Sequence, residues 1–147
     1  MPSYEQGFGF PVLDDALYFP GDRSKLFAVE AKVFSSTQIH VAAGTPLKAV
    51  LVWTDPPGST LVKDLDLRVA GPNGEVHYGN EVLHPAQRDT VNNVEAITIG
   101  TPVAGTYSVS VDSASVPTGV QSYALVVTGD ISTSAATATT KRRSARH

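Results

Sequence analysis

The stretch LVWTDPPGSTLVKDLDLRV, residues 51–69, decides how this chain can fold. An apolar run ends at Trp53, and Pro56 and Pro57 follow it closely. Each proline removes a backbone donor, so no strand continues through this pair. The alternating residues DLDL at 64–67 then predict a second strand, with a loop of about ten residues before it.

Two carboxylates share one face of this second strand. Side chains alternate across a strand, so Asp64 and Asp66 point away from Leu65 and Leu67. At about 3.3 Å rise per residue, the two acids lie roughly 7 Å apart, and they repel each other unless they are solvated or bridged. An amphipathic strand with a solvated acidic edge fits this spacing. A calcium ion held by oxygen ligands fits it too, and the spacing alone leaves both interpretations open.

Similar short patterns recur through most of the chain. They are separated by turn sequences such as AGTP at 43–46 and GPNG at 71–74. We therefore predict about eight strands, at residues 25–33, 37–41, 47–53, 65–70, 75–78, 94–99, 106–111 and 121–128. Trp53 ends an apolar strand and is predicted to lie in the core. The fold class predicted is all-β, an antiparallel β-sandwich, and a jelly roll has this number of strands.

The first residues have a different pattern. Leu13, Ala16 and Leu17 follow helical spacing, and Pro11 suits a first helical turn, so a short helix is predicted at 12–18. A two-turn helix is too short to be stable alone in water. The segment 6–19 carries much apolar surface, so it must pack on the sandwich or drive self-association. Its large apolar residues are Phe8, Phe10, Leu13, Leu17 and Phe19.

Charge is distributed unevenly along the 147 residues. All fourteen acidic residues lie at or before Asp130, with only seven of the eleven Lys and Arg residues, so residues 1–130 carry about −7. This acidic body argues against nucleic-acid binding. Beyond it, a Ser/Thr/Ala-rich segment and four basic residues predict a disordered tail. The domains predicted are thus a linker with a short helix at 1–22, a sandwich at 23–130 and a tail at 131–147.

The composition excludes several classes of protein. There is no cysteine, so disulfides, thiolate zinc sites and a cysteine nucleophile are excluded. No apolar run approaches the ~20 residues of a membrane span. No secretory signal precedes Met1, which predicts either a cytosolic chain or a fragment of a longer precursor.

Several motifs occur in an order that resembles one family. They are LVWTDPPGS at 51–59, DLDL at 64–67, GPNG at 71–74, YGN at 78–80, NNVE at 92–95, GTY at 105–107 and YALVVTG at 123–129. Together they resemble the C-terminal jelly-roll β-sandwich domain of subtilisin-like serine proteases, over roughly residues 6–129. The segment 6–19 looks like the last helix of the protease domain just upstream. Lys63 and Phe10 depart from the family, which usually has Asn and commonly has Arg at these positions.

The resemblance implies a function. It implies a non-catalytic accessory domain of a secreted subtilisin-like protease, which stabilises or docks on the catalytic domain of the same parent chain. It also implies calcium binding, and candidate residues here offer some of the 6–8 oxygens that calcium takes: Asp64, Asp66, Asp55, Asn93 and Glu95. The alternative is a glycan- or protein-binding sandwich, with Tyr78 and His84 as candidate contacts near the long polar loop 79–92.

The chain is predicted not to be an enzyme on its own. It contains no Gly-Thr-Ser sequence, the context of the nucleophile in a subtilisin-like triad. None of its four histidines, at positions 40, 77, 84 and 147, lies in the family's catalytic setting. Asp64 and Asp66 are too close together for the paired-carboxylate chemistry of glycoside hydrolysis.

Overall fold

A computed structural model describes residues 25–30, 35–58, 60–83, 85, 87–116 and 121–133. These residues form strands and connecting loops, with no helix among them. The strands are β1 (Lys25–Glu30), β2 (Ser35–Val41), β3 (Leu47–Trp53), β4 (Asp64–Ala70), β5 (Val76–Tyr78), β6 (Val94–Ile99), β7 (Gly105–Ser115), β8 (Tyr123–Thr128) and β9 (Ile131–Thr133).

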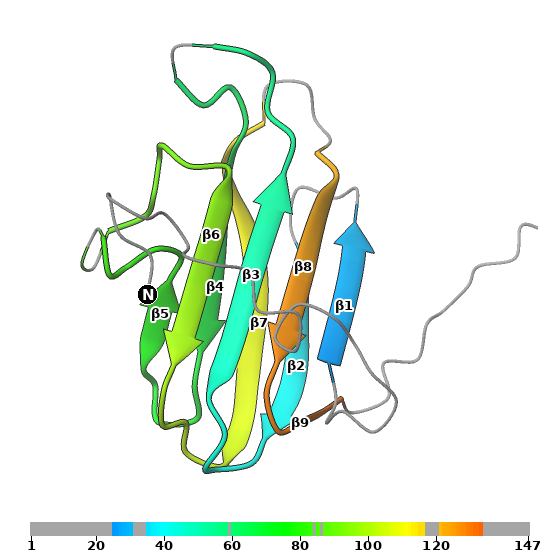
Figure 1. Cartoon of the computed structure of the whole chain (residues 1–147), viewed down its shortest axis with the longest axis vertical. Coiled ribbons are helices and arrows are strands. Elements are labelled where there is room, and N and C mark those ends of the chain that lie inside the picture. The colour runs from blue at the N-terminus through cyan, green and yellow to red at the C-terminus, as the bar shows by residue number, and fades with distance from the viewer. Residues whose placement is uncertain are drawn as a thin grey trace, which may run out of the picture.

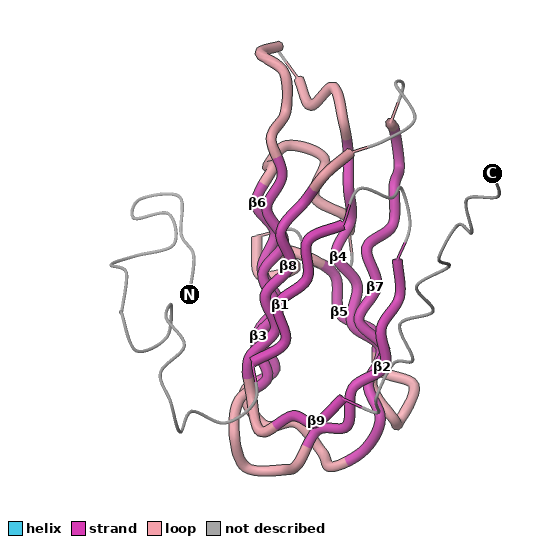
Figure 2. The backbone as a smooth tube through the Cα atoms, turned by 90° about the vertical axis from the view of Figure 1, so that its right-hand side faces the viewer, coloured by secondary structure: helices cyan, strands magenta, loops and turns pink. Residues whose placement is uncertain are grey.

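The strands form two antiparallel sheets packed face to face. One sheet has the order β1-β8-β3-β6, and the other has the order β5-β4-β7-β2-β9. Figure 1 shows the four-stranded sheet in front of the five-stranded one, and Figure 2 shows the two layers edge-on. The predicted all-β antiparallel sandwich is confirmed, and the arrangement is consistent with a jelly roll.

The core lies between the sheets and follows the alternation of the sequence. On β4, Leu65, Leu67 and Val69 are fully buried, and Trp53 at the end of β3 is 2% exposed. The prediction that Trp53 belongs to the core is confirmed. Burying one such aliphatic side chain contributes about 1.5–3 kcal/mol, so these inward rows account for much of the pairing of the two layers.

Most strand boundaries agree with the prediction to within two residues. β7 runs to Ser115, four residues past its predicted end at 111, and a further difference lies after Asp130. The tail was predicted to be disordered from residue 131, but Ile131–Thr133 forms β9 against β2. The prediction is wrong here because Ile131 is 4% exposed and adds its side chain to the core. One apolar residue beside a formed strand is enough to extend a sheet, whatever the average composition of the segment.

Some predictions concern residues outside those described. The predicted helix at 12–18, the end of the first predicted strand at 31–33 and the tail beyond Thr133 are among them. Within the described ranges, no helix is long and apolar enough to cross a lipid bilayer.

Candidate functional site

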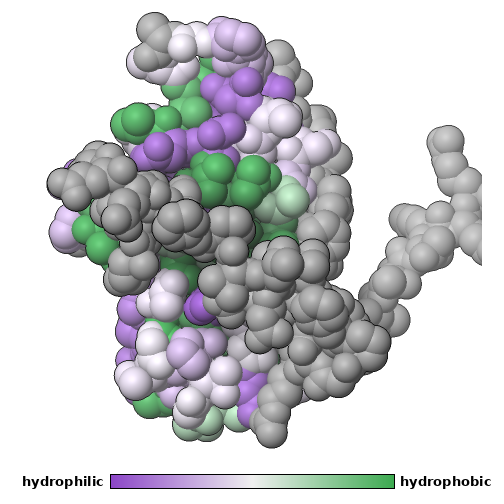
Figure 3. Space-filling model, in the orientation of Figure 1, coloured by the Kyte–Doolittle hydropathy of each residue, from purple (hydrophilic) through white to green (hydrophobic). Residues whose placement is uncertain are grey.

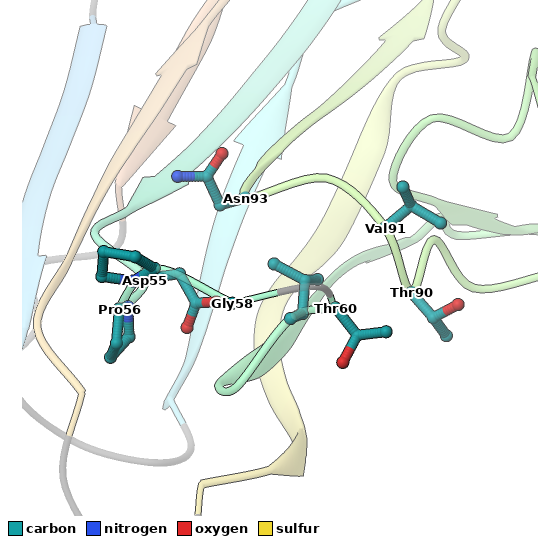
Figure 4. Close-up of a pocket in the computed structure, with 9 residues that line it drawn as sticks. Asp55, Pro56, Gly58, Thr60, Thr90, Val91 and Asn93 are labelled. Carbon is teal, nitrogen blue, oxygen red and sulfur yellow. The ribbon is translucent and has the colours of Figure 1, made fainter.

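The candidate site lies at one end of the sandwich, where two loops meet. Residues 54–63 connect β3 to β4, and residues 79–93 connect β5 to β6. Between them lies a pocket of about 400 Å³ (Figure 4). It is lined by Asp55, Pro56, Pro57, Gly58, Thr60, Leu61, Thr90, Val91 and Asn93.

Asp55 closes the first loop on itself. Its Oδ1 accepts a hydrogen bond from the Lys63 N–H and its Oδ2 accepts one from the Val62 N–H, each at 2.8 Å. The indole N–H of Trp53 donates to the Lys63 carbonyl oxygen at 2.9 Å. Both carboxylate oxygens of Asp55 are therefore hydrogen-bonded within the loop, and they fix where β4 begins.

Asn93 extends the pairing of β3 and β6 into the pocket wall. The Trp53 N–H donates to the Asn93 carbonyl oxygen at 3.2 Å, and the Asn93 side-chain Nδ2 donates to the Trp53 carbonyl oxygen at 2.9 Å. Asn93 thus positions the start of β6, next to Thr90 and Val91 on the same wall (Figure 4).

The acidic face of β4 is bridged by an arginine. Asp66 lies opposite Asp112 on β7, and like charges at opposed positions destabilise a sheet. Arg88, from the second loop, donates from Nη1 to Asp66 Oδ2 at 2.5 Å, and its Nη2 lies 3.8 Å from Asp112 Oδ2. Its guanidinium carbon also lies 5.9 Å from the centre of the Tyr78 ring. The guanidinium of Arg88 therefore supplies positive charge between the carboxylates of Asp66 and Asp112.

Burial raises the pKa of both predicted β4 ligands. For Asp64 burial is the main cause, and the negative charge of Asp66 adds to it. For Asp66 burial again dominates, while the hydrogen bond from Arg88 opposes the rise in pKa. Asp64 also has one buried oxygen, Oδ1, without a hydrogen-bond partner, and a register shift separates it from Leu65.

The chain crosses from one sheet to the other between Gly79 and Asn80. The Gly79 N–H donates to the Leu67 carbonyl oxygen on β4, and the Asn80 N–H donates to the Ala96 carbonyl oxygen on β6, each at 2.9 Å. Asn80 has a φ of 55°, a left-handed conformation that Asn tolerates better than most residues. Its Oδ1 accepts from the Ala96 N–H at 3.0 Å, so its side chain completes the free edge of β6.

At this crossing the side chain of Glu95 accepts a backbone hydrogen bond from β4 that a neighbouring strand would otherwise accept. Its Oε2 accepts the Leu67 N–H at 2.6 Å, which no longer has a β5 partner because the chain has turned away. The side chain is 1% exposed, and its Oε1 has no partner. Burial, opposed by the Leu67 hydrogen bond and reinforced by the charges of Asp66 and Asp89, raises the pKa of Glu95 to about 8. Glu95 is therefore protonated at neutral pH.

Asp89 organises the second loop. Its oxygens accept hydrogen bonds from the Val91 and Asn92 N–H groups and from the side-chain amides of Asn92 and Asn80. Burial acts to raise the pKa of Asp89, but these hydrogen bonds outweigh it and hold the pKa below its usual value. We call Gly79, Asn80, Asp89 and Glu95 the polar joint, because they connect the two sheets.

The five predicted calcium ligands fall into two groups. Asp55 and Asn93 line the pocket, whereas Asp64, Asp66 and Glu95 lie beside Arg88 and the polar joint. All but Asp64 have a hydrogen-bonded side chain. Over the residues that the structure describes, no group of three or more His, Asp or Glu side chains is arranged to hold a metal ion. Calcium binding stays a prediction.

Of the two predicted glycan or protein contacts, Tyr78 and His84, the structure describes Tyr78. Tyr78 is half-buried under Arg88, and Trp53 is 2% exposed. His84 lies outside the described residues. His40 Nδ1 is 3.0 Å from Thr106 Oγ1, and His77 Nδ1 is 2.8 Å from Glu81 Oε1. Neither of these two histidines is hydrogen-bonded to a serine within the described residues.

The roles of Arg88, Asn80 and Asp89 could not be predicted from the sequence, because these residues lie in the long loop without any periodic pattern. One signal was available for Glu95: it alternates with Ile97 and Ile99, which places a carboxylate on an inward face. An inward carboxylate must be paired or protonated.

Fold and site define a small antiparallel β-sandwich domain whose polar residues connect two sheets and two loops. The chain is similar to the Serine protease/ABC transporter B family protein tagB of Dictyostelium discoideum, with 38% identity over 95 residues. The match covers 56% of this chain and 5% of that protein. No protein-family model matches this chain.

Proposed function

We propose that this chain is a non-catalytic accessory domain of a secreted subtilisin-like serine protease, which it stabilises by docking on the catalytic domain. The observation that carries the proposal is the 95-residue similarity to a protein named as a serine protease. The fold adds support, because a compact sandwich of this size forms a rigid body that can pack on a neighbouring domain.

The motifs behind the family resemblance have structural roles. The DPP loop is closed by Asp55, the YGN motif makes the crossing between sheets, and NNVE contributes Asn93 and Glu95. These residues hold the domain together. Such roles support the proposal, because a stabilising accessory domain depends on its shape and stability.

The test uses the catalytic domain that the proposal implies for the parent protease, produced with and without this chain. The half-life of peptidase activity at raised temperature should be longer with the chain attached, while the chain alone should not turn over a peptide substrate. Equal half-lives would overturn the stabilising role. Turnover by the chain alone, sensitive to a serine-directed inhibitor, would overturn its non-catalytic character.

Calcium binding is part of the same proposal. Asp64 Oδ1 and Glu95 Oε1 are buried carboxyl oxygens without partners, and calcium takes oxygen ligands. Its binding would release the proton that Glu95 holds at neutral pH. When bound, the ion would supply positive charge between carboxylates that otherwise repel each other. Asp55 and Asn93, which line the pocket, are less direct candidates because their side chains are hydrogen-bonded to the backbone.

A second candidate function is recognition of a peptide in the pocket between the two loops. The pocket combines apolar surface from Pro56, Leu61 and Val91 with the polar side chains of Thr90 and Asn93, a mixture typical of binding sites. Screening a peptide library against the chain and against Val91→Arg tests it, since Val91 is 70% exposed. Val103→Arg is the control, because Val103 is also exposed but does not line the pocket. Equal retention of peptides by all three proteins would exclude the pocket.

A further inference from the structure

The outer faces of the two sheets differ in chemistry. On the five-stranded sheet, the outward residues of β2 are Ser36, Gln38 and His40, all exposed. Ser36 is hydrogen-bonded to Ser108 and His40 to Thr106, both across to β7. This is the polar face expected of an antiparallel sheet with one side in water.

The outer face of the four-stranded sheet is apolar. Its outward residues on β3 include Val50 and Val52, which are 36% and 40% exposed. In register, Val50 lies between Ala96 and Val126, and Val52 lies between Val94 and Ala124. Two complete rows across β6, β3 and β8 therefore carry only Val and Ala.

Polar residues return only in the next row, where Lys48 lies between Thr98 and Thr128. Figure 3, which views the molecule from the side of this sheet, shows a cluster of hydrophobic atoms on the upper part of this face. A contiguous apolar patch of this kind on a sheet face marks a surface that another segment or molecule covers. The contrast with the five-stranded sheet shows that the chain makes polar outer faces where they meet water.

The length and composition of the chain before β1 identify the covering segment. β1 is the edge strand of this sheet and begins at Lys25, so residues 1–24 join the sheet directly. Three strand spacings of about 4.8 Å make the distance across the sheet about 14 Å. Five extended residues, such as 20–24, span up to about 17 Å. The segment 6–19 therefore reaches all of the apolar rows, and it supplies matching surface in Phe8, Phe10, Leu13, Leu17 and Phe19.

We infer that residues 6–19 of this chain pack across the outer face of the β1-β8-β3-β6 sheet, over β3 and β8, as a third layer of the domain. This intramolecular layer buries the rows of Val50 and Val52 together with the apolar side chains of the segment. It does not depend on the proposed protease role.

The test is made on the full chain by NMR. Because the chain has no cysteine, Asp15→Cys gives a single position for a nitroxide label and leaves the apolar residues of the segment unchanged. The label should weaken the amide signals of Val50, Val52 and Val126 more than those of Ser36 and Gln38. A label at Gln38→Cys, on the polar outer face, is the matched control and should reverse this order.

A second variant tests the chemistry of the contact. Leu13→Ser with Leu17→Ser in the Asp15→Cys chain should abolish the selective signal loss, while the amide chemical shifts of the inward strand residues stay unchanged. Signal loss that is absent, or equal on both sheets, would overturn the inference. Loss that appears only between a labelled molecule and a separate isotope-enriched molecule would assign the face to a second copy and would also overturn it.

Discussion

Replacing Glu95 by glutamine should make the domain more stable at alkaline pH. Glu95 is 1% exposed, accepts the Leu67 N–H and has a pKa of about 8 in the folded protein, against an ordinary value of 4.5. Glutamine has the same shape, keeps an oxygen for the Leu67 N–H and carries no charge at any pH. The substitution therefore removes the titration and keeps the hydrogen bond.

The sign follows from proton linkage. Between pH 4.5 and about 8 the folded state holds a proton on Glu95 that the unfolded state has lost, so stability falls as the pH rises through this range. With 1.36 kcal/mol per pKa unit, the proton stabilises the fold by roughly 2–3 kcal/mol at pH 6 and by less than about 1 kcal/mol at pH 8. The expected loss in the wild-type chain over these two pH units is thus about 2 kcal/mol.

Three neighbouring carboxyl groups, those of Asp64, Asp66 and Asp89, also contribute to the pH dependence of stability. The raised pKa values of Asp64 and Asp66 also make stability fall with increasing pH, starting from their ordinary value of 3.8. The lowered pKa of Asp89 acts in the opposite direction, because its contribution is lost as the pH falls through its folded-state value, below 3.8. Among the carboxyl groups of the described residues, Glu95 is the one whose pKa is raised to about 8.

Urea unfolding between pH 5 and 9 measures the free energy of unfolding at each pH. The signal of Trp53 reports the transition, because this residue is buried and is the single tryptophan of the chain. The wild-type free energy of unfolding should fall from pH 6 to pH 8, and that of Glu95→Gln should change much less. Glu75→Gln, on the β4–β5 hairpin, is the control and should keep the wild-type slope. If wild type and Glu95→Gln have the same slope, Glu95 is not a buried protonated acid and the reasoning fails.

Three further substitutions or conditions test the same end of the sandwich. Gly79→Ala would place a Cβ 2.6 Å from the Glu95 Cβ and should lower the free energy of unfolding by about 1–3 kcal/mol. Gly100→Ala, which has open space around it, is the control and should have a small effect, so equal urea midpoints for the two variants would contradict the tight packing at Gly79. Arg88→Met should lower the free energy of unfolding by about 1–3 kcal/mol, because it leaves Asp66 buried without a partner. Adding Asp66→Asn should recover part of this loss, and an unchanged urea midpoint for Arg88→Met alone would show that the Arg88–Asp66 ion pair does not stabilise the fold. Calcium should raise the melting temperature by several degrees relative to chelator, an effect that Asp64→Asn should abolish and Glu75→Gln should leave. A melting temperature that changes with neither calcium nor chelator would leave Arg88 as the bridging cation.

The sequence was sufficient to predict eight of the nine described strands, because alternation reports which face of a strand meets the core. β3 and β6 have the predicted bounds, and Trp53 is buried as expected. The site could be predicted only in part. The acidic positions of β4 were found from their spacing, but their partner Arg88 comes from a loop 22 residues further along the chain. No local pattern reports such a contact, because it depends on how a loop without periodicity folds back.

β9 and Asn80 escaped prediction for a related reason. Ile131 is a single apolar residue in a segment of polar composition, and its burial depends on β2 being already in place. Asn80 connects to β6 through a left-handed backbone and a side chain that imitates a peptide group. The formation of β9 and the contacts of Asn80 both depend on tertiary structure, so local sequence patterns could not predict them.

The capture of the Leu67 N–H by Glu95 has a consequence for how these molecules behave at high concentration. β5 covers β4 only as far as Arg68, so the next stretch of β4 would otherwise be an open edge that another chain could pair with. Glu95 occupies the Leu67 donor and Gly79 occupies its acceptor, which leaves no unpaired backbone group at that residue. A buried acid thus protects the domain against edge-to-edge aggregation, because it occupies the backbone donor that the carbonyl group of another chain would need.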